Sequence, residues 1–260
     1  MRGPFVTALS TALASLLLLV APPSQAHDLD AGNAPRQLRV NHDLSRLRSK
    51  RYGAMELRLA PYFPAVDREF SGATPYRDAF GKGPSWTFGL EGDWQIFHIP
   101  HLGSIGPGLG WHFGWRNGTA PFTDPATPGE SAHPQRMWIM PMFAVAVFRL
   151  DVLKQDFRIP LVPYAKFGLA VNIWEARDGH ELSTVDGLKG KGLEFGWTGH
   201  LGLMLHLNPL SPQGATDMDV SVGVNDAYLF VEWWYSDVSS FGKGMQVGSN
   251  TLSMGLAVEF

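Results

Sequence analysis

The sequence predicts an all-β fold, an eight-stranded antiparallel up-and-down β-barrel that crosses a membrane. Eight segments after residue 51 alternate apolar residues with polar or small ones, which is the period of a strand with two different faces. The connections between these segments alternate between long and short, and the last segment ends on an aromatic residue, Phe260. Alternating segments of about ten residues, in an even number, are the signature of a bacterial transmembrane barrel.

The last segment, residues 250–260, has a strict period of two. Its polar or small face carries Thr251 and Glu259, and its apolar face is formed by Leu252, Met254, Leu256, Val258 and Phe260. This ending resembles the C-terminal strand that the assembly machinery of Gram-negative outer membranes reads. The resemblance implies an integral outer-membrane protein, surrounded by outer-membrane lipids. It also implies the barrel assembly machinery and periplasmic chaperones as partners during biogenesis.

The expected strands lie at about 53–62, 85–97, 105–116, 136–149, 159–174, 193–207, 227–236 and 250–260. In the first three, apolar side chains are expected outside and polar ones inside, because a charged group at mid-strand is costly in lipid. Segment 136–149 is apolar on both faces, since Ile139 and Val145 alternate with Met140 and Ala144, so its facing stays open. Most of the nine tryptophans fall near expected strand ends, as in the aromatic girdles of membrane barrels.

The connections fall into two classes when they are numbered alternately. Those expected to be outer loops are long and rich in Gly, Pro, Asp and Ser, at about 63–84, 117–135, 175–192 and 237–249. Those at 98–104 and 150–158 are short, as periplasmic turns are. The connection at 208–226 is the exception, because it is long and leaves room for a short helix after Pro209 and Pro212.

The beginning of the chain predicts export. Residues 1–26 combine Arg2, an apolar run and a small-residue cleavage site after Ala26, which is typical of a cleaved signal peptide. Residues 27–51 are polar and aperiodic, and we expect a basic periplasmic tail. Its segment 36–51 is a candidate contact for lipid headgroups or cell-wall polymer. The barrel is expected to occupy 52–260.

Composition excludes several classes of function. The chain has no Cys, so it has neither a disulfide framework nor a cysteine-based metal site. Its 21 basic and 24 acidic side chains do not indicate nucleic acid as a partner. No later window is long and apolar enough for a membrane helix. The sequence indicates no cofactor.

The expected interior of the barrel collects charged and polar side chains. We predict a structural polar cluster formed by Glu56, Arg58, Glu91, Asp93, His112, Arg116, Lys166, His200 and Glu232. Glu194, His206 and Glu259 are expected inside as well. Eight strands enclose room only for side chains or one small ligand. Because a buried charge without a partner is costly, Arg58, Arg116 and Lys166 are expected to pair with the carboxylates.

Two chemical alternatives remain open for the same interior. His112, His200 and His206 are potential metal ligands, but they lie at different expected heights and match no ligand spacing. A membrane-embedded lipid-modifying enzyme needs a nucleophile and base at the lipid face, and the chain has no GxSxG motif. No catalytic, cofactor-binding or metal-binding residue is therefore expected.

A soluble alternative is a periplasmic lipocalin-like barrel that binds a small apolar ligand, which reverses the two faces of every strand. The terminal Phe260 and the alternation of loop lengths favour the membrane barrel. We expect a structural or interaction role, with activity not specified by the sequence.

Five stretches of the chain look like a family of outer-membrane β-barrel proteins from myxobacteria and their relatives. They are Gly89–Pro100, Gly103–Gly114, Arg158–Leu169, Gly223–Trp233 and Met245–Phe260. The similarity runs from about residue 52 to the end. It implies the barrel and the outer membrane, and it transfers no catalytic or ligand-binding residue.

Overall fold

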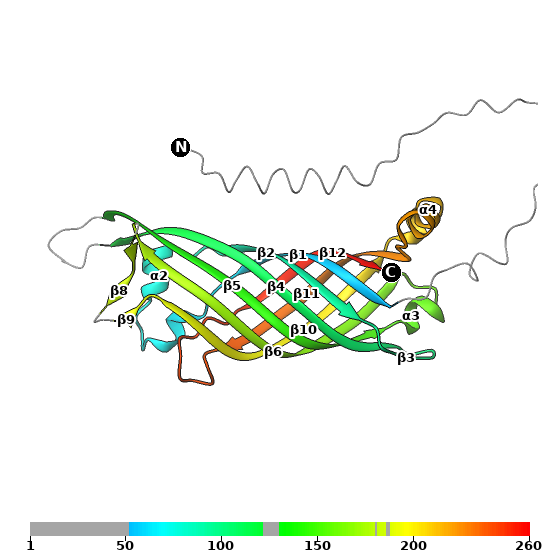
Figure 1. The fold of residues 1–260 in the computed structure, drawn as a ribbon, viewed down its shortest axis with the longest axis horizontal. Coiled ribbons are helices and arrows are strands. Elements are labelled where there is room, and N and C mark those ends of the chain that lie inside the picture. The colour runs from blue at the N-terminus through cyan, green and yellow to red at the C-terminus, as the bar shows by residue number, and fades with distance from the viewer. Residues whose placement is uncertain (1–51, 122–129, 180, 186–187) are drawn as a thin grey trace, which may run out of the picture. The chain divides into compact units, whose positions relative to one another are not determined.

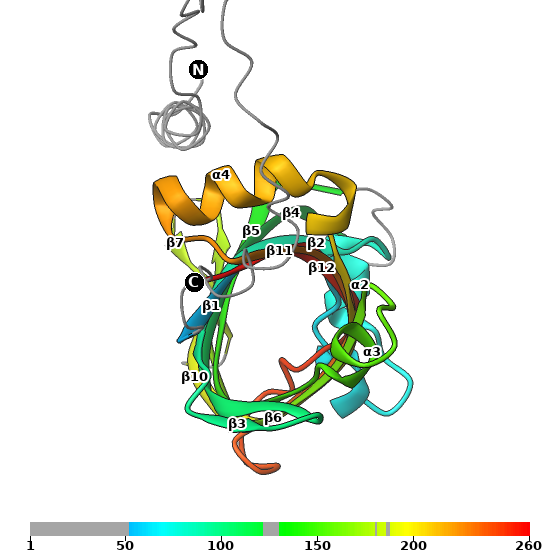
Figure 2. The ribbon, with the colours of Figure 1, turned by 90° about the vertical axis from the view of Figure 1, so that its right-hand side faces the viewer.

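The computed structural model describes residues 52–121, 130–179, 181–185 and 188–260, and its central feature is a closed barrel (Figures 1 and 2). The eight long strands are β1 (Gly53–Tyr62), β2 (Ser85–Trp94), β4 (Gly103–Pro121), β5 (Glu130–Leu150), β6 (Leu161–Asp178), β10 (Lys191–His206), β11 (Asp226–Val238) and β12 (Asn250–Glu259). Each pairs antiparallel with the next, and β12 pairs with β1. The predicted eight-stranded up-and-down barrel is confirmed.

The first and last strands close the barrel by pairing with each other. Glu56 lies opposite Ala257 and Arg58 opposite Gly255 in the ladder. The backbone carbonyl of Phe260 accepts hydrogen bonds from the N–H groups of Tyr52 and Gly53, at 2.8 and 3.2 Å. Since closure removes the free edges of the sheet, the terminal strand is held along most of its length.

Several expected strand boundaries differ from the observed ones. The strands β4, β5 and β6 run past the expected ends at 116, 136 and 174, because their ladders continue between polar residues, as at Gln135 opposite Asp178. The expected strand 85–97 stops at Trp94, and a separate short strand, β3 (Phe97–Ile99), pairs with β4.

The two ends of the barrel differ. The terminal end, where β1 begins and β12 stops, carries α3 (Val152–Gln155), η3 (Asn208–Leu210) and α4 (Pro212–Val222). The opposite loop end carries η2 (Val66–Glu69), α2 (Pro75–Phe80), β7 (Glu181–Leu182), β8 (Thr184–Val185) and β9 (Leu188–Lys189). The helix α4 occupies the exceptional connection 208–226 and ends at Gly223, whose φ of 72° favours glycine. Within the described residues, the helices are too short or too polar to span a membrane.

The structure settles the facing of 136–149. Ile139, Phe143, Val145 and Val147 are buried inside the barrel, whereas Met140, Met142, Ala144 and Ala146 point outward. The alternation continues to Arg149, which is also buried. Alternate residues of a strand lie on the same face. Arg149 shares its face with Ile139, Phe143, Val145 and Val147, so its inward position requires that they point inward as well.

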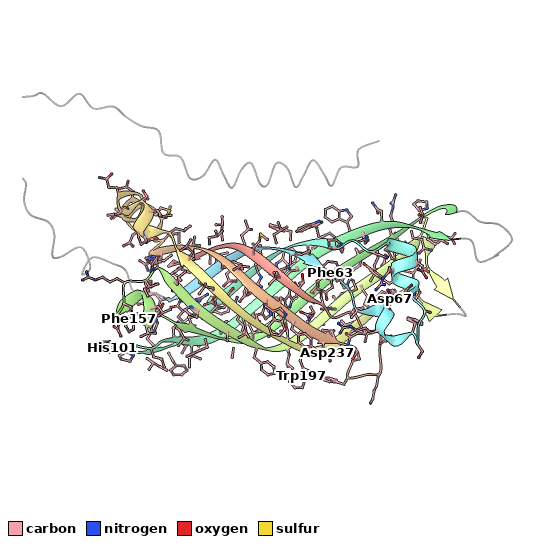
Figure 3. The ribbon with its side chains drawn as sticks, turned by 180° about the vertical axis from the view of Figure 1, so that it is seen from behind. Phe63, Asp67, His101, Phe157, Trp197 and Asp237 are labelled. Carbon is pink, nitrogen blue, oxygen red and sulfur yellow. The ribbon has the colours of Figure 1, made fainter. Side chains whose placement is uncertain are left out.

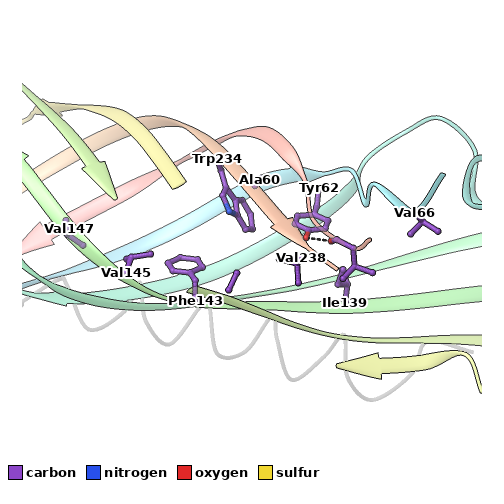
Figure 4. Packing of buried hydrophobic residues seen from close by; sticks show 11 residues of the cluster. Ala60, Tyr62, Val66, Ile139, Phe143, Val145, Val147, Trp234 and Val238 are labelled. Atoms are coloured by element: carbon purple, nitrogen blue, oxygen red, sulfur yellow. Dashed lines mark hydrogen bonds between the residues drawn. The ribbon is translucent and has the colours of Figure 1, made fainter. Parts of the chain in front are cut away.

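The interior contains two apolar clusters and a set of ion pairs. The larger cluster lies toward the loop end and includes Tyr62, Ile139, Trp234, Val238 and Val247 (Figure 4). The smaller one contains Val162, Tyr164, Met204, Tyr228, Phe230 and Ala257. Side chains on the outer surface project away from the strands, as Trp197 does from β10 (Figure 3). The expected signal peptide, 1–26, and basic tail, 27–51, lie outside the described residues.

Candidate functional site: a buried ion network in the lumen

Arg58, at the middle of β1, is the centre of the lumen. Its side chain is fully buried, and its guanidinium donates to Glu56 at 2.8 Å and to Glu91 and Glu232. The guanidinium carbon also lies 5.5 and 5.6 Å from the ring centroids of Phe143 and Phe230. An arginine presents five N–H donors in a planar fork, so one side chain can serve carboxylates on β1, β2 and β11 together.

Lys166, on β6, reaches the same carboxylates from the other side of the lumen. Its Nζ lies 2.8 Å from Glu56, 2.7 Å from Glu91 and 3.8 Å from Glu232. Tyr164 donates its hydroxyl to the second oxygen of Glu232 at 2.9 Å. Three carboxylates are thus held between two cations.

Arg149 extends these contacts toward the terminal end. It binds Asp93 through two nitrogens, at 2.9 and 2.6 Å, and also contacts Glu56 at 3.3 Å and Glu259 at 3.7 Å. The side-chain amide of Gln95 donates a hydrogen bond to Glu259 at 2.9 Å. We call the connected set the lumen network, which consists of Glu56, Arg58, Glu91, Asp93, Arg149, Lys166, Glu232 and Glu259.

The strand register creates the need for these cations. Glu56 and Glu91 are direct partners in the β1–β2 ladder, and both point inward. Two like charges directly opposite each other destabilise a sheet, and a buried charge without a partner costs several kcal/mol. Arg58 and Lys166 each contact both carboxylates, so the pair is stable only with these cations in place.

Carboxylates outnumber cations in the lumen network. Five acidic and three basic side chains give a formal charge of −2 when all are ionised and the neighbouring histidines are neutral. Tyr164 and Tyr228 offset part of this excess, since their hydroxyls donate to Glu232 and Glu259, each at 2.9 Å. The network is therefore held by hydrogen bonds as well as by charge.

The three histidines do not form one group. Arg58 donates to Nε2 of His112 at 3.2 Å, which leaves that histidine with its proton on Nδ1, because arginine cannot accept. Nδ1 of His200 lies 2.9 Å from Glu232 and 3.5 Å from the Arg58 guanidinium. His206 lies apart, paired with Asp226 at 2.8 Å. The expectation of three different heights is thus wrong for His112 and His200, which both contact Arg58.

A hydroxyl, an imidazole and a carboxylate stand in line at His200. The Thr198 hydroxyl lies 3.0 Å from Nε2 of His200, whose Nδ1 faces Glu232. All three residues are about 1% exposed. The indole of Trp234 donates to the Thr198 hydroxyl at 3.1 Å, which also lies 3.1 Å from the carbonyl of Tyr235. A nucleophile with these partners and no exposed surface has no room for a substrate, so we assign the line a structural role.

A second chemical possibility is a cation held by carboxylates. Among the described residues, Glu56, Glu91 and Asp93 have one ligand oxygen each within 4.8 Å of one another. Arg58, Lys166 and Arg149 already donate to these three carboxylates. The residues present therefore supply their own positive charge, and this geometry does not fit a metal ion.

The partners of Arg116 differ from those predicted. It was expected to neutralise carboxylates, but its guanidinium donates to the backbone carbonyls of Phe80, at 2.7 Å, and Gly83. Within the described residues it forms no ion pair with a carboxylate. Arg116 lies near the loop end of β4, beyond the reach of the lumen network, so it anchors the connection 63–84.

Arg149 is the member of the lumen network that sequence reasoning missed. It follows Val145 and Val147 at the same period, so its inward position was readable once the facing of the strand was known. The apolar character of both faces concealed that signal. Lys154, in α3, was also missed, and it pairs with Asp226 at 3.3 Å near the terminal end.

The connection 239–249 is hydrogen-bonded to inward side chains at the loop end of the barrel. The carbonyl of Val247 accepts hydrogen bonds from Tyr62 at 2.6 Å and Asn172 at 3.0 Å, and the Val247 side chain is fully buried. The N–H of Ala65 donates to the carbonyl of Gly248 at 2.9 Å.

In α2, burial raises the pKa of Tyr76 to about 12, despite the opposing effect of the nearby Arg116.

Comparison with known proteins gives distant structural neighbours only. No protein-family model matches the chain, and no curated protein is similar in sequence. The attachment invasion locus protein Ail of Yersinia pestis has a TM-score of 0.41 and 10% identity, over 82% of this chain and 99% of Ail. The outer membrane protein OprG of Pseudomonas aeruginosa has a TM-score of 0.43 and 11% identity, over 82% and 97%.

A third neighbour is the N-terminal β-barrel domain of Pseudomonas aeruginosa OprF, with a TM-score of 0.37 and 8% identity, over 81% of this chain and all of that domain. These three neighbours are outer-membrane β-barrel proteins. The assignment of eight strands here rests on the strand pairing of the chain itself.

Proposed function

We propose that the protein is an integral outer-membrane barrel with a filled, non-conducting lumen and a structural or interaction role at its loop end. The observation that carries this proposal is the apolar belt on the outside of the barrel. Along β10, every outward position from Leu193 to Leu205 is Leu, Phe, Trp or Gly. At ~3.3 Å per residue this covers ~40 Å of strand, or ~28 Å at a tilt of ~45°.

That height matches a bilayer, whose hydrocarbon core is ~30 Å thick. Apolar side chains of the other strands continue the belt, and they include Leu109, Trp111, Phe167, Leu169, Leu229, Val231, Leu252, Met254 and Leu256. A contiguous apolar surface of this extent is far larger than soluble monomers expose. Charges in the lumen and apolar residues outside are also the reverse of a soluble calyx for an apolar ligand.

Buried side chains along the lumen support the filled, non-conducting interior that we propose. The lumen network crosses the middle of the barrel, and Tyr62, Trp234 and Val247 pack toward the loop end. The interaction role is supported by the loop end, where the connections 63–84 and 239–249 are hydrogen-bonded to each other. We further propose that a cleaved signal peptide directs export and that the assembly machinery recognises the strand ending in Phe260.

Two measurements test the membrane location. The refolded full chain should float with lipid vesicles and show faster gel mobility unheated than heated. Leu201→Arg, on the outside of β10 near the middle of the belt, should lower the free energy of unfolding by about 2–4 kcal/mol, since it places a charge near mid-bilayer. The matched change Leu210→Arg, on an exposed residue of η3, should have little effect. A chain that stays in solution without detergent overturns the proposal.

The lumen proposal has its own test. In planar bilayers the inserted wild-type barrel should give no resolved single-channel steps. Regular, uniform conductance steps from a pure, inserted sample would show an open pore and contradict the filled lumen. The control is a variant lacking 240–248, part of the connection that covers the loop end, which should still insert because the strands remain intact.

A further inference from the structure

The outside of β5, β6 and β10 carries a row of cations directly above the apolar belt. Arg136 and Arg177 are direct partners in the β5–β6 ladder, and Lys191 lies opposite Glu175 in the β6–β10 ladder. All four side chains share the outward face of their strands. One step further toward the belt, Trp138 occupies the position at which aromatic residues mark a membrane interface.

The cation row carries an excess of positive charge. Arg136, Arg177 and Lys191 are exposed, and Arg177 pairs with Glu175. Within the described part of the chain, Arg136 and Lys191 form no ion pair. Two arginines directly opposite each other repel unless an anion lies between them. The three cations and one carboxylate leave a formal charge of +2 on this face, so the row is suited to a phosphate group.

An apolar groove lies on the same strands, closer to the middle of the belt. It has a volume of about 660 Å³ and is lined by Leu109, Trp111, Met142, Ala144, Leu169 and Phe195. The groove exists because the short side chain of Ala144 stands between larger residues on β4 and β6. Its volume lies within the range of about 300–1,000 Å³ that is typical of small-molecule sites.

The cations and the groove are aligned by the strand register. Lys191 and Phe195 are four residues apart on β10, and Arg136 and Met142 are six apart on β5, which corresponds to about 13–20 Å along the strands. A lipid whose phosphate lies at the interface places its acyl chain at this distance. One molecule can therefore occupy both features.

We infer that this face binds one phosphate-bearing lipid of the outer leaflet, with its phosphate at Arg136, Arg177 and Lys191 and an acyl chain in the groove. The inference rests on the proposed membrane location and adds a lipid ligand to it. The phosphate accepts hydrogen bonds from the two guanidinium groups and relieves their repulsion. The acyl chain fills a depression that solvent does not reach in a bilayer.

The test uses the full chain in phosphatidylcholine nanodiscs that contain the bis-phosphorylated glycolipid lipid A. Native mass spectrometry should count one retained lipid A per barrel. Arg136→Gln with Arg177→Gln should weaken its affinity by about 30-fold, because each cation near an anionic headgroup contributes about 1 kcal/mol. Arg68→Gln with Lys82→Gln removes the same charge from the connection 63–84, and should leave retention within about twofold.

The groove is tested by filling it. Ala144→Phe should weaken lipid A retention by about tenfold, since it displaces about two buried methylene groups. Val231→Phe, on the outside of β11, is the matched control and should have no effect. Equal retention in wild type and the double Arg variant overturns the inference. Release by millimolar inorganic phosphate, with no effect of Ala144→Phe, shows a free-anion site and also overturns it.

Insertion is read separately from lipid retention, through heat-dependent gel mobility of the same samples. An inserted barrel that retains no lipid A counts against the lipid site alone. A barrel that fails to insert counts against the membrane location.

Discussion

Replacing Arg58 by Met is the sharpest test of the lumen network. The change keeps an unbranched side chain beside the rings of Phe143 and Phe230 and removes the charge. It deletes the contacts to three carboxylates and leaves Lys166 as the only cation that touches Glu91 among the described residues. Breaking a buried ion pair by removing one partner costs about 3–5 kcal/mol. We take about 4 kcal/mol as the expected loss, since Lys166 retains part of the compensation.

The assay is equilibrium unfolding in urea from lipid vesicles, followed by gel mobility and tryptophan fluorescence. With a slope of about 2 kcal/mol per M, a loss of 4 kcal/mol moves the midpoint down by about 2 M. Arg68→Met, an exposed site in η2, is the control and should move it by less than about 0.3 M. Arg58→Lys should fall between the two, because an ammonium keeps the charge and loses the planar fork.

A second substitution separates charge from packing. Glu91→Gln alone removes one acid from a network that has two more carboxylates than cations, so its cost should stay below about 1 kcal/mol. Combined with Arg58→Met it should recover about half of the loss, because fewer buried charges then lack partners. Strictly additive effects, or a midpoint for Arg58→Met within 0.5 M of wild type, would refute the reasoning.

Three further changes test the packing of the lumen, the connection 239–249 at the loop end, and the assembly of the barrel. Gly110→Ala should cost about 1–3 kcal/mol in urea unfolding, since its Cβ overlaps a buried aromatic ring, whereas Gly199→Ala meets only ordinary contacts and should be tolerated. Tyr62→Phe should speed tryptic cleavage after Lys243 severalfold, because it removes a hydrogen bond of about 1 kcal/mol that holds the covering connection; an unchanged rate contradicts this. Phe260→Ala should reduce the heat-modifiable form in outer-membrane fractions, and equal yields would count against the assembly signal.

Much of the architecture could be predicted from the alternation of apolar and polar residues along the strands. Once Glu56 and Arg58 are placed inside β1, pairing with β2 follows from adjacency in the chain, and pairing with β12 follows from closure of the barrel. Strand 136–149 was the exception, because a lumen that contains apolar clusters gives its strand two apolar faces. The inward position of Phe143 depends on rings from β4, β10 and β11 that the local pattern does not encode.

Contacts across the lumen were harder to predict than facing. Alternation says that Arg116 and Lys166 point inward, but not how far each lies from a carboxylate along the barrel axis. That distance depends on strand stagger, which is set by the sum of all the registers. Lys166 therefore meets Glu56, whereas Arg116 meets the carbonyl groups of Phe80 and Gly83.

The positions of the paired charges along the chain explain why the lumen contains ion pairs and is not uniformly apolar. Arg58 lies on β1, and its partner Glu232 lies on β11, at the far end of the chain. These residues meet only when β12 pairs with β1, so an open sheet leaves both without this contact. A buried ion pair contributes little net stability, but an unpaired buried charge is costly. The lumen network therefore penalises an unclosed or misregistered barrel more than it stabilises the closed one, which links charge pairing to the strand that ends at Phe260.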